Sequence, residues 1–329
     1  MKVFILTEGG KGIGFGHITR CSALYEAFEE KCIRPYFIAN TDNSVKALLK
    51  GKKAKIFNWL RKQAELLYLI SGADVVIIDS YLAGYNLYRK IAGQAKLAVY
   101  IDDNKRLNYP RGIVINGSIF AEKLDYPPKE GATYLLGVKY MPLQKEFWSI
   151  PRGKIKRNIA NILVTFGGSD SKNMTLKVLR FLADAYPELN KLVIIGRGFK
   201  NIKEVERSKD GKTDLIYYPS AIDVKEAMLR ADIAVSAGGQ TLYELARIGL
   251  PSIGICLADN QNANLAGWQK AGFIENIGGY KDVDLALKLR MGVERLFPYQ
   301  ERIKRSRIGS SLVDGKGADR IVDLIKKRI

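Results

Sequence analysis

Residues 221–244 read AIDVKEAMLRADIAVSAGGQTLYE and contain, in order, a helix, a short strand, two glycines and a second helix. The run at residues 233–236 is short and mostly apolar, as a buried strand is. Gly238 and Gly239 follow it, and the next helix is predicted to begin after Gln240. A strand that turns through glycines into a helix is the repeating unit of a parallel sheet covered by helices on both faces.

The same alternation extends over almost the whole chain. Strands are predicted at residues 3–6, 36–39, 75–79, 97–101, 159–166, 192–195, 215–218, 233–236 and 252–255. Helices are predicted near residues 18–30, 44–50, 59–71 and 82–92, and after Ser171, Ile222, Gln240 and Asn260. These elements predict an α/β fold of two doubly wound, Rossmann-like domains that face each other across a cleft.

Residues 139–158 interrupt the alternation with Pro142, Pro151, Gly153 and a basic cluster, as a linker does. We therefore expect a sugar and catalytic-base domain over residues 1–150 and a nucleotide domain over residues 151–329. The last basic helix is a candidate to pack back on the first domain. The length of 329 residues suits two domains of about 150 residues each.

The chain carries 53 Lys and Arg against 34 Asp and Glu, a formal net charge of +19. Such a balance fits nucleic acid, an anionic membrane surface or a phosphate-bearing ligand. The charges are scattered along predicted helices and no nucleic-acid-binding motif is present, so we expect no nucleic acid partner. The expected partner is an anionic nucleotide, with at most a weak attraction to an anionic membrane surface.

The cysteines, the single histidine and the length of the apolar stretches indicate where the protein is located and whether it binds a metal. Cys21, Cys32 and Cys256 have neither zinc-site nor CxxC spacing, which favours a reducing, cytoplasmic location. The longest nearly apolar stretch, residues 249–258, is far shorter than the roughly 18 residues of a membrane-spanning helix. One histidine cannot supply a His-rich metal site, and we expect neither a metal nor a cofactor.

A glycine-rich loop follows the first predicted strand, where residues 7–21 read TEGGKGIGFGHITRC. Its glycines let the backbone approach a ligand, but their irregular spacing argues against a nicotinamide-nucleotide motif. His17 stands where the loop becomes a helix, and a helix N-terminus favours the neutral imidazole that acts as a general base. The alternative is a structural imidazole or cap. Arg20 either reaches a phosphate or carboxylate of the ligand or pairs with an acid of the protein.

Acidic residues end two other strands of the first half. Asp79 precedes Ser80, and Asp102 and Asp103 follow residues 97–101. Carboxylates in these places bind sugar hydroxyls, orient water or hold His17 in one tautomer. Asp102 and Asp103 equally suit a turn or a helix cap. No GxSxG motif is present, which argues against a serine hydrolase.

Two strand–glycine–helix loops in the second half are predicted to bind a diphosphate. One contains Gly167 and Gly168, and the other contains Gly238 and Gly239, with Thr241 as an added hydroxyl donor. Glu244 lies one turn further on, where its carboxylate can accept both hydroxyls of a ribose. The alternative is an ordinary capped helix start with an acid in its first turns.

A polar stretch follows the predicted strand at residues 252–255. Gln261 and Asn264 share a helical face and can touch sugar or phosphate oxygens. The alternative, a polar cluster that caps the helix, explains the same residues.

These motifs resemble those of known families. Residues 223–261 resemble the UDP-binding half of GT-B enzymes, particularly the peptidoglycan N-acetylglucosaminyltransferases. The closer resemblance adds residues 14–21 (GFGHITRC), 79–81 (DSY), 102–103 (DD), 166–170 (FGGSD) and 260–261 (NQ). Together they resemble the UDP-2,4-diacetamido-2,4,6-trideoxy-β-L-altropyranose hydrolases of pseudaminic acid synthesis and their spore-coat polysaccharide relatives, over nearly the whole chain.

The resemblance implies a GT-B-like hydrolase that releases UDP by attack of water at the anomeric carbon with inversion, with His17 as the base and Glu244 on the ribose. The other residues it implies are Gly14, Gly16, Arg20, Asp79, Tyr81, Asp102 and Asp103 for the sugar, and Gly167, Gly168, Ile222, Gly238, Gly239, Gln240, Thr241, Asn260 and Gln261 for the nucleotide. This chain departs from the pattern in residues 8–12, which lengthen the first loop, and in Gln144, where a basic residue is expected. A glycosyltransferase with a UDP-sugar donor and a hydroxyl acceptor is the alternative.

Overall fold

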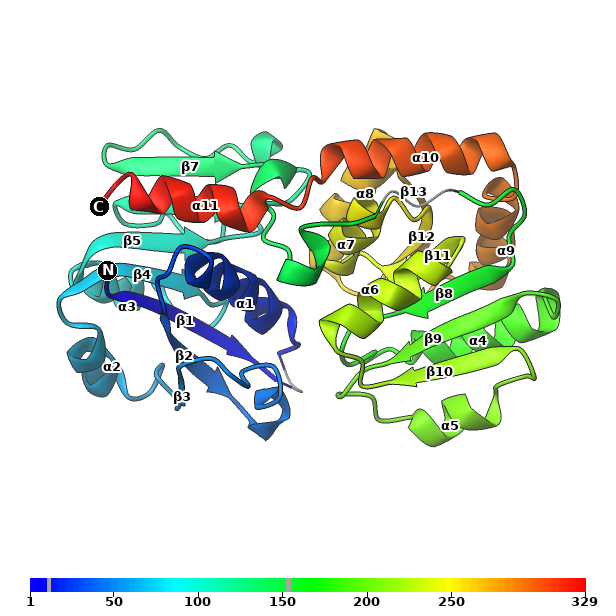
Figure 1. Cartoon of the computed structure of the whole chain (residues 1–329), viewed down its shortest axis with the longest axis horizontal. Coiled ribbons are helices and arrows are strands. Elements are labelled where there is room, and N and C mark those ends of the chain that lie inside the picture. The colour runs from blue at the N-terminus through cyan, green and yellow to red at the C-terminus, as the bar shows by residue number, and fades with distance from the viewer. Residues whose placement is uncertain (11–12, 152–154) are drawn as a thin grey trace. The chain divides into compact units, whose positions relative to one another are not determined.

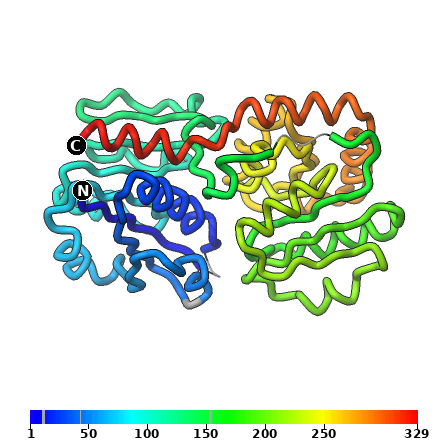
Figure 2. The backbone as a smooth tube through the Cα atoms, in the orientation of Figure 1, coloured from blue at the N-terminus to red at the C-terminus, as the bar shows by residue number. Residues whose placement is uncertain are grey.

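The computed structural model describes residues 1–10, 13–151 and 155–329 (Figure 1). The chain divides into two compact units, the first comprising Met1–Lys145 and Gly315–Ile329 and the second Glu146–Asp314. Figure 2 shows the single continuous trace that leaves the first unit, forms the second and returns with the last helix to the first. Gly153 and the start of the basic cluster in the predicted linker lie outside the described residues.

The first unit contains a seven-stranded parallel sheet in the order β3-β2-β1-β4-β5-β6-β7 (Figure 1). The strands are β1 (Val3–Gly9), β2 (Tyr36–Thr41), β3 (Ala54–Ile56), β4 (Ala73–Asp79), β5 (Ala95–Ile101), β6 (Gly112–Asn116) and β7 (Ala132–Leu136). The strands predicted at residues 3–6, 36–39, 75–79 and 97–101 are confirmed as β1, β2, β4 and β5. β3 and β7 were not predicted because they are edge strands, which need no continuous apolar run. The short β6 was missed as well.

Four helices belong to the first unit, together with short 3-10 turns, over its described residues. They are α1 (Gly16–Glu29), α2 (Gln63–Ile70), α3 (Tyr85–Ala92) and α11 (Gly317–Lys326), with η1 (Asn43–Val45), η2 (Ala121–Lys123) and η3 (Val138–Tyr140). A further turn, η4 (Lys145–Phe147), lies where the chain passes to the second unit.

Two predicted helices of the first half were wrong in type or extent. Residues 44–50 form η1 and successive turns, because the segment is too short to propagate an α-helix before Gly51, whose φ of +81° ends it. The helix predicted at residues 59–71 begins only at Gln63. Trp59 is buried instead, and its indole Nε1 donates to the carbonyl of Thr7 at 2.9 Å.

The C-terminal helix α11 packs against α1 in the first unit (Figure 1). Its apolar side buries Ile321, Val322 and Ile325. Lys31 joins the two helices at the surface, with Nζ 2.7 Å from Asp319 and 3.0 Å from Asp323. The first unit therefore completes its core with the last residues of the chain.

The second unit has a six-stranded parallel sheet in the order β10-β9-β8-β11-β12-β13. Its strands are β8 (Asn161–Thr165), β9 (Asn190–Ile195), β10 (Thr213–Tyr217), β11 (Ile233–Ala237), β12 (Ser252–Cys256) and β13 (Ile274–Gly279). Its helices are α4 (Met174–Ala185), α5 (Ile202–Arg207), α6 (Ala221–Arg230), α7 (Thr241–Ile248), α8 (Asn262–Ala271), α9 (Leu285–Arg295) and α10 (Tyr299–Leu312), and η5 (Asp259–Gln261) precedes α8. The prediction of two parallel α/β domains is confirmed.

Local capping shifts the start of one helix. The helix predicted after Ile222 begins at Ala221, because Ser220 and Asp223 form a reciprocal capping box ahead of it. Ile222 is therefore a first-turn residue, and its side chain is 52% exposed. Among the described residues, no helix is both long and apolar enough to cross a membrane.

Candidate active site

The loop between β1 and α1 places His17 at the second position of α1. Gly10 and Gly14 pair across the loop, with Gly14 N 2.7 Å from Gly10 O and Gly10 N 2.9 Å from Gly14 O. Gly14 has a φ of +99°, which residues other than glycine rarely adopt. Lys11 and Gly12 lie outside the described residues. The pairing of Gly10 with Gly14 leaves His17 at the carboxyl end of β1.

His17 is 7% exposed, and its Nδ1 lies 2.7 Å from Oδ1 of Asp79. Nη2 of Arg20 lies 2.6 Å from the same oxygen and 3.0 Å from Nδ1. We assign the proton of the neutral ring to Nδ1, so that Nδ1–H and Arg20 both donate to Asp79. An unprotonated Nδ1 would set its lone pair against a carboxylate oxygen. Nε2 is then the nitrogen that accepts a proton.

Arg20 joins the two carboxylates around His17. Its Nε donates to Oδ2 of Asp79 at 2.6 Å, and its Nη1 donates to Oδ1 of Asp103 at 2.6 Å. Burial by itself raises the pKa of Asp79, but the charge of Arg20 and the hydrogen bonds from Arg20 and His17 outweigh burial and hold that pKa well below its ordinary value. Two carboxylates and one guanidinium give the group a net charge of −1 while His17 is neutral.

Tyr81 completes this cluster from the loop after β4. Its ring stands edge-on to the imidazole of His17, with the centroids 4.5 Å apart and the planes at 90°. Its hydroxyl donates to Oδ2 of Asp103. Burial, and then the charge of Asp103, raises the pKa of Tyr81 far above its ordinary value, so the hydroxyl keeps its proton. The structure thus brings together His17, Arg20, Asp79, Tyr81 and Asp103.

Asp102 does not join them. It is buried, and Oδ1 accepts from the backbone N–H groups of Asp103 at 2.9 Å, Asn104 at 3.3 Å and Arg106 at 3.2 Å. Its Oδ2 accepts from the Tyr126 hydroxyl at 2.7 Å. Both oxygens of Asp102 thus accept hydrogen bonds from the protein, as the turn alternative expects, and a role of Asp102 in sugar binding stays a prediction.

In the second unit, β11 ends at Ala237 and leads through Gly238 and Gly239 into α7. A Cβ on Gly238 would lie 2.7 Å from Leu265 Cγ and 2.9 Å from Gln261 Cβ, so only glycine fits against α8. A Cβ on Gly239 would meet no atom within 4 Å. The side chain of Gln240, the N-cap residue of α7, makes no capping hydrogen bond to the first turn of the helix.

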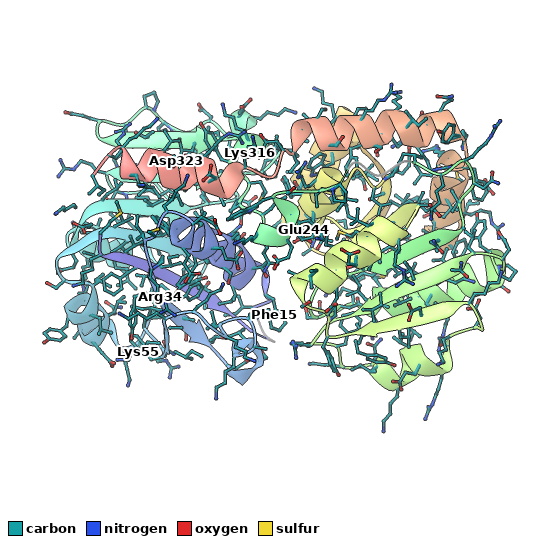
Figure 3. All side chains as sticks on the ribbon, in the orientation of Figure 1. Phe15, Arg34, Lys55, Glu244, Lys316 and Asp323 are labelled. Atoms are coloured by element: carbon teal, nitrogen blue, oxygen red, sulfur yellow. The ribbon has the colours of Figure 1, made fainter. Side chains whose placement is uncertain are left out.

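Four of the predicted glycines have open space where a side chain would begin. A Cβ built on Gly14, Gly16, Gly167 or Gly239 would meet no atom within 4 Å. Ligand atoms can therefore approach the backbone at these positions. Phe15 separates Gly14 from Gly16 and is the N-cap residue of α1 (Figure 3).

Gln261 and Asn264 hold the Gly238 loop rather than cap α8. Oε1 of Gln261 accepts from Gly238 N at 3.3 Å and from Leu257 N at 2.9 Å. Nδ2 of Asn264 donates to Gly238 O at 2.8 Å, and its Oδ1 accepts from the Tyr243 hydroxyl at 2.5 Å. The capping hydrogen bond of the alternative interpretation is absent at Gln261 over the described residues. These side chains tie the carboxyl ends of β11 and β12 together.

Glu244 is a buried carboxyl on α7 (Figure 3), 8% exposed. Within the part of the chain that the structure describes, it has neither a hydrogen bond nor an ion pair. Burial raises its pKa to about 7 from an ordinary 4.5. An unpartnered buried carboxyl is costly in isolation, and a ligand with two adjacent hydroxyl donors would satisfy it.

The other predicted diphosphate loop differs from the one before α7. Asp170 accepts from the backbone N–H groups of Met174 at 2.8 Å and Thr175 at 2.7 Å, so a carboxylate of the protein occupies the start of α4. Two N–H groups at the start of α4 are therefore already bound to an anion of the protein, and diphosphate binding at Gly167 and Gly168 stays a prediction. The carbonyl of Gly168 accepts from Gly198 N at 2.8 Å. A Cβ built on Gly167 would meet no atom within 4 Å.

The remaining predicted residues stand at the edge of the α7 site. Gln240 is the N-cap of α7 and Thr241 its first residue. Asn260 is exposed in η5, next to Gln261. No group of three or more His, Cys, Asp and Glu side chains that could hold a metal ion occurs among the residues the structure describes.

One buried acid of the first unit was missed by sequence reasoning. Glu8, the penultimate residue of β1, is fully buried and binds the loop that carries Tyr81. The sequence signal that could have identified Glu8 was an acidic residue at the end of a predicted strand, just before the glycine-rich loop.

Comparison with known proteins agrees with this architecture. Residues 161–306 match the glycosyltransferase family 28 C-terminal domain. Over 99% of its length the chain superposes on all of Acinetobacter baumannii MurG, with a TM-score of 0.66 and 14% sequence identity. The chain therefore has the GT-B fold, and the family 28 match lies within its second unit.

Two curated relatives are more similar in sequence. The spore coat polysaccharide biosynthesis protein SpsG of Bacillus subtilis is 27% identical over 99% of this chain and 98% of its own length. A Helicobacter pylori protein, the pseudaminic acid cytidylyltransferase and UDP-2,4-diacetamido-2,4,6-trideoxy-β-L-altropyranose hydrolase, is 26% identical over 79% of this chain. The match spans 45% of that relative's length. The resemblance to this group is confirmed.

Proposed function

We propose that the chain hydrolyses a UDP-linked deoxy amino sugar, releasing UDP by attack of water at the anomeric carbon with inversion. The broader assignment, an enzyme that acts on nucleotide sugars in surface-polysaccharide synthesis, is supported by the family 28 domain and by similarity to SpsG. The narrower one is supported by similarity to the Helicobacter pylori hydrolase. The geometry around His17 supports the hydrolytic step.

The observation that carries the proposal is the contact between His17 Nδ1 and Asp79 at 2.7 Å. With the proton of the neutral ring on Nδ1, Nε2 accepts a proton from water as the water oxygen bonds to the anomeric carbon. The bond from that carbon to the diphosphate oxygen breaks, and its electron pair leaves with UDP. An inverting enzyme needs such a base on the face opposite the leaving group.

The charge around His17 suits this proton transfer. Arg20, Asp79 and Asp103 together carry −1 while the ring is neutral, so protonation of His17 brings the group to zero. The negative charge of these three residues stabilises the imidazolium that forms when His17 takes the proton from water.

The start of α7 is the proposed leaving-group site. The N-terminus of a helix favours the negative charge of a diphosphate, and Thr241, the first residue of α7, would add a hydroxyl donor. Glu244 would accept from the two ribose hydroxyls. Gly167, Ile222 and Asn260 border this ligand in the proposal.

The test is incubation of the purified protein with UDP-sugars and no acceptor. Equimolar free sugar and UDP, with initial inversion at the anomeric carbon by NMR, are expected. His17→Asn should abolish turnover and leave UDP binding by calorimetry intact. UDP release that appears only with an added hydroxyl compound would instead establish a glycosyltransferase, the function that the family 28 match favours as the second candidate.

A further inference from the structure

Glu8 is a buried carboxylate that the proposed reaction does not use. It is 0% exposed and lies in the central part of the sheet, opposite Asn40 of β2. The preceding residue, Thr7, pairs with Asp79 of β4. Burying a carboxylate is costly unless its oxygens are hydrogen-bonded, so the partners of Glu8 indicate its role.

The partners all come from the loop that follows β4. Oε2 of Glu8 accepts from Ser80 Oγ at 2.6 Å. Oε1 accepts from the backbone N–H groups of Tyr81 at 2.7 Å and Leu82 at 3.1 Å. Ser80 Oγ itself accepts from Ala83 N at 2.9 Å. Successive N–H groups directed at one anion form a nest, so the conformation of this loop depends on the carboxylate.

We propose that Glu8 is a positioning residue for His17: it holds the loop that sets the Tyr81 ring edge-on against the imidazole. Asp79 determines which nitrogen of His17 carries the proton, and Tyr81 restrains the plane of the ring at a centroid distance of 4.5 Å. The two contacts together direct Nε2. The assignment of Nε2 as a catalytic base rests on the proposed function, whereas the coupling from Glu8 to His17 does not.

The carboxylate is required because all three donors face it. In Glu8→Gln one oxygen remains for the N–H groups of Tyr81 and Leu82, but the amide NH₂ would meet the Ser80 hydroxyl. That hydroxyl already accepts from Leu82 N at 3.2 Å and Ala83 N at 2.9 Å. E8Q therefore keeps the volume of the side chain and removes the Ser80 contact, and Glu8→Ala removes every contact.

The single histidine of the chain makes the test direct, because ¹³C,¹⁵N-histidine labelling yields one imidazole spin system, that of His17. We expect E8Q and E8A to displace the ring-proton resonances of His17, since the Tyr81 ring current changes, while the ¹⁵N shifts keep the Nδ1–H pattern. Tyr81→Leu should displace the same resonances. Folded E8Q and E8A proteins with wild-type His17 resonances would overturn the proposal.

Asp232→Asn is the matched control for a buried carboxylate that binds backbone. Asp232 lies in the second unit and accepts from Ala160 N at 2.9 Å and Asn161 N at 2.8 Å. D232N should leave the His17 resonances unchanged. If neither Glu8 variant folds, amide exchange in the wild-type protein decides: the Tyr81 and Leu82 amides are expected to be protected, and rapid exchange at both would refute the hydrogen bonds proposed.

Kinetics separate this proposal from the proposed function. E8Q is expected to lower kcat by about 10- to 100-fold, as a small misplacement of a catalytic group does, with UDP affinity unchanged. Wild-type protein that releases no UDP would refute the hydrolase while leaving the NMR result standing. Wild-type kcat in E8Q, with unmoved His17 resonances, would refute only the positioning role.

Discussion

Nδ1 of His17 and Oδ1 of Asp79 lie 2.7 Å apart, although the two residues are separated by 62 positions in the chain. β1 leads into the helix of His17, β4 ends at Asp79, and the two strands pair in parallel with Thr7 opposite Asp79. Parallel pairing places both strand ends at one edge of the sheet. The imidazole and the carboxylate therefore meet on a rigid support.

Replacing Asp79 with Asn tests the role of this pair. Asp79→Asn removes one negative charge, so protonation of His17 would take the cluster from zero to +1 rather than from −1 to zero. We expect kcat to fall by about 10²- to 10⁴-fold, with UDP affinity by calorimetry unchanged. Wild-type kcat in a folded D79N protein would exclude the proposed proton transfer.

Glu244 should make stability depend on pH in the unliganded protein. Its pKa is about 7 when folded and 4.5 ordinarily, so the folded chain holds this proton more tightly. The resulting stabilisation is complete below pH 4.5 and is lost as the pH rises through 7, a change of about 3 kcal/mol. The amide of Glu244→Gln does not ionise, so this variant does not lose the same stability as the pH rises. The unfolding free energy of the variant minus that of wild type should therefore increase by about 3 kcal/mol between pH 4 and pH 8.

Urea unfolding at several pH values measures this difference. Glu204→Gln, the same substitution at an exposed position of α5, is the control for exchanging a carboxyl group for an amide. A pH-independent difference between E244Q and wild type would contradict the environment described for Glu244.

Nucleotide binding should depend on the same carboxyl. Ribose hydroxyls donate best to the ionised form, so UDP affinity should rise as the pH increases through about 7 and binding at lower pH should release a proton. Calorimetry in buffers of different ionisation enthalpy measures that proton. E244Q should not release this proton, so that any proton release that remains comes from the phosphate of UDP. Glu244→Ala should weaken UDP binding by about 10- to 100-fold at pH 8.

Adjacent glycines provide a paired steric test before α7. Gly238→Ala would press a methyl group against Leu265 and Gln261, and we expect it to lower the unfolding free energy by about 1–3 kcal/mol. Gly239→Ala meets no atom within 4 Å and should unfold like wild type, yet bind UDP more weakly because its methyl group stands where the diphosphate approaches. Equal loss of stability in both variants would refute the packing described for Gly238.

The local sequence pattern was sufficient to predict the buried strands but not the strands at the edges of the sheets. β1, β2, β4 and β5 carry apolar runs because they are covered on both faces. β3 and β13 do not: β3 has three residues, and β13 contains Glu275, Asn276 and two glycines. Trp59 lies outside the helix predicted for it and donates a hydrogen bond to Thr7, 52 positions away. A contact over that distance cannot be predicted from a local sequence pattern.

The residues around the candidate sites followed from strand order, because parallel strands present their carboxyl ends at one edge. Their individual roles did not. Asp79 is the last residue of β4 and Asp102 directly follows β5, yet Asp79 binds His17 and Asp102 binds its own loop. Asp170 closes the start of α4 while that of α7 has no side-chain cap. These outcomes depend on side-chain directions and on donor distances of about 3 Å, set by packing between distant segments rather than by spacing along the chain.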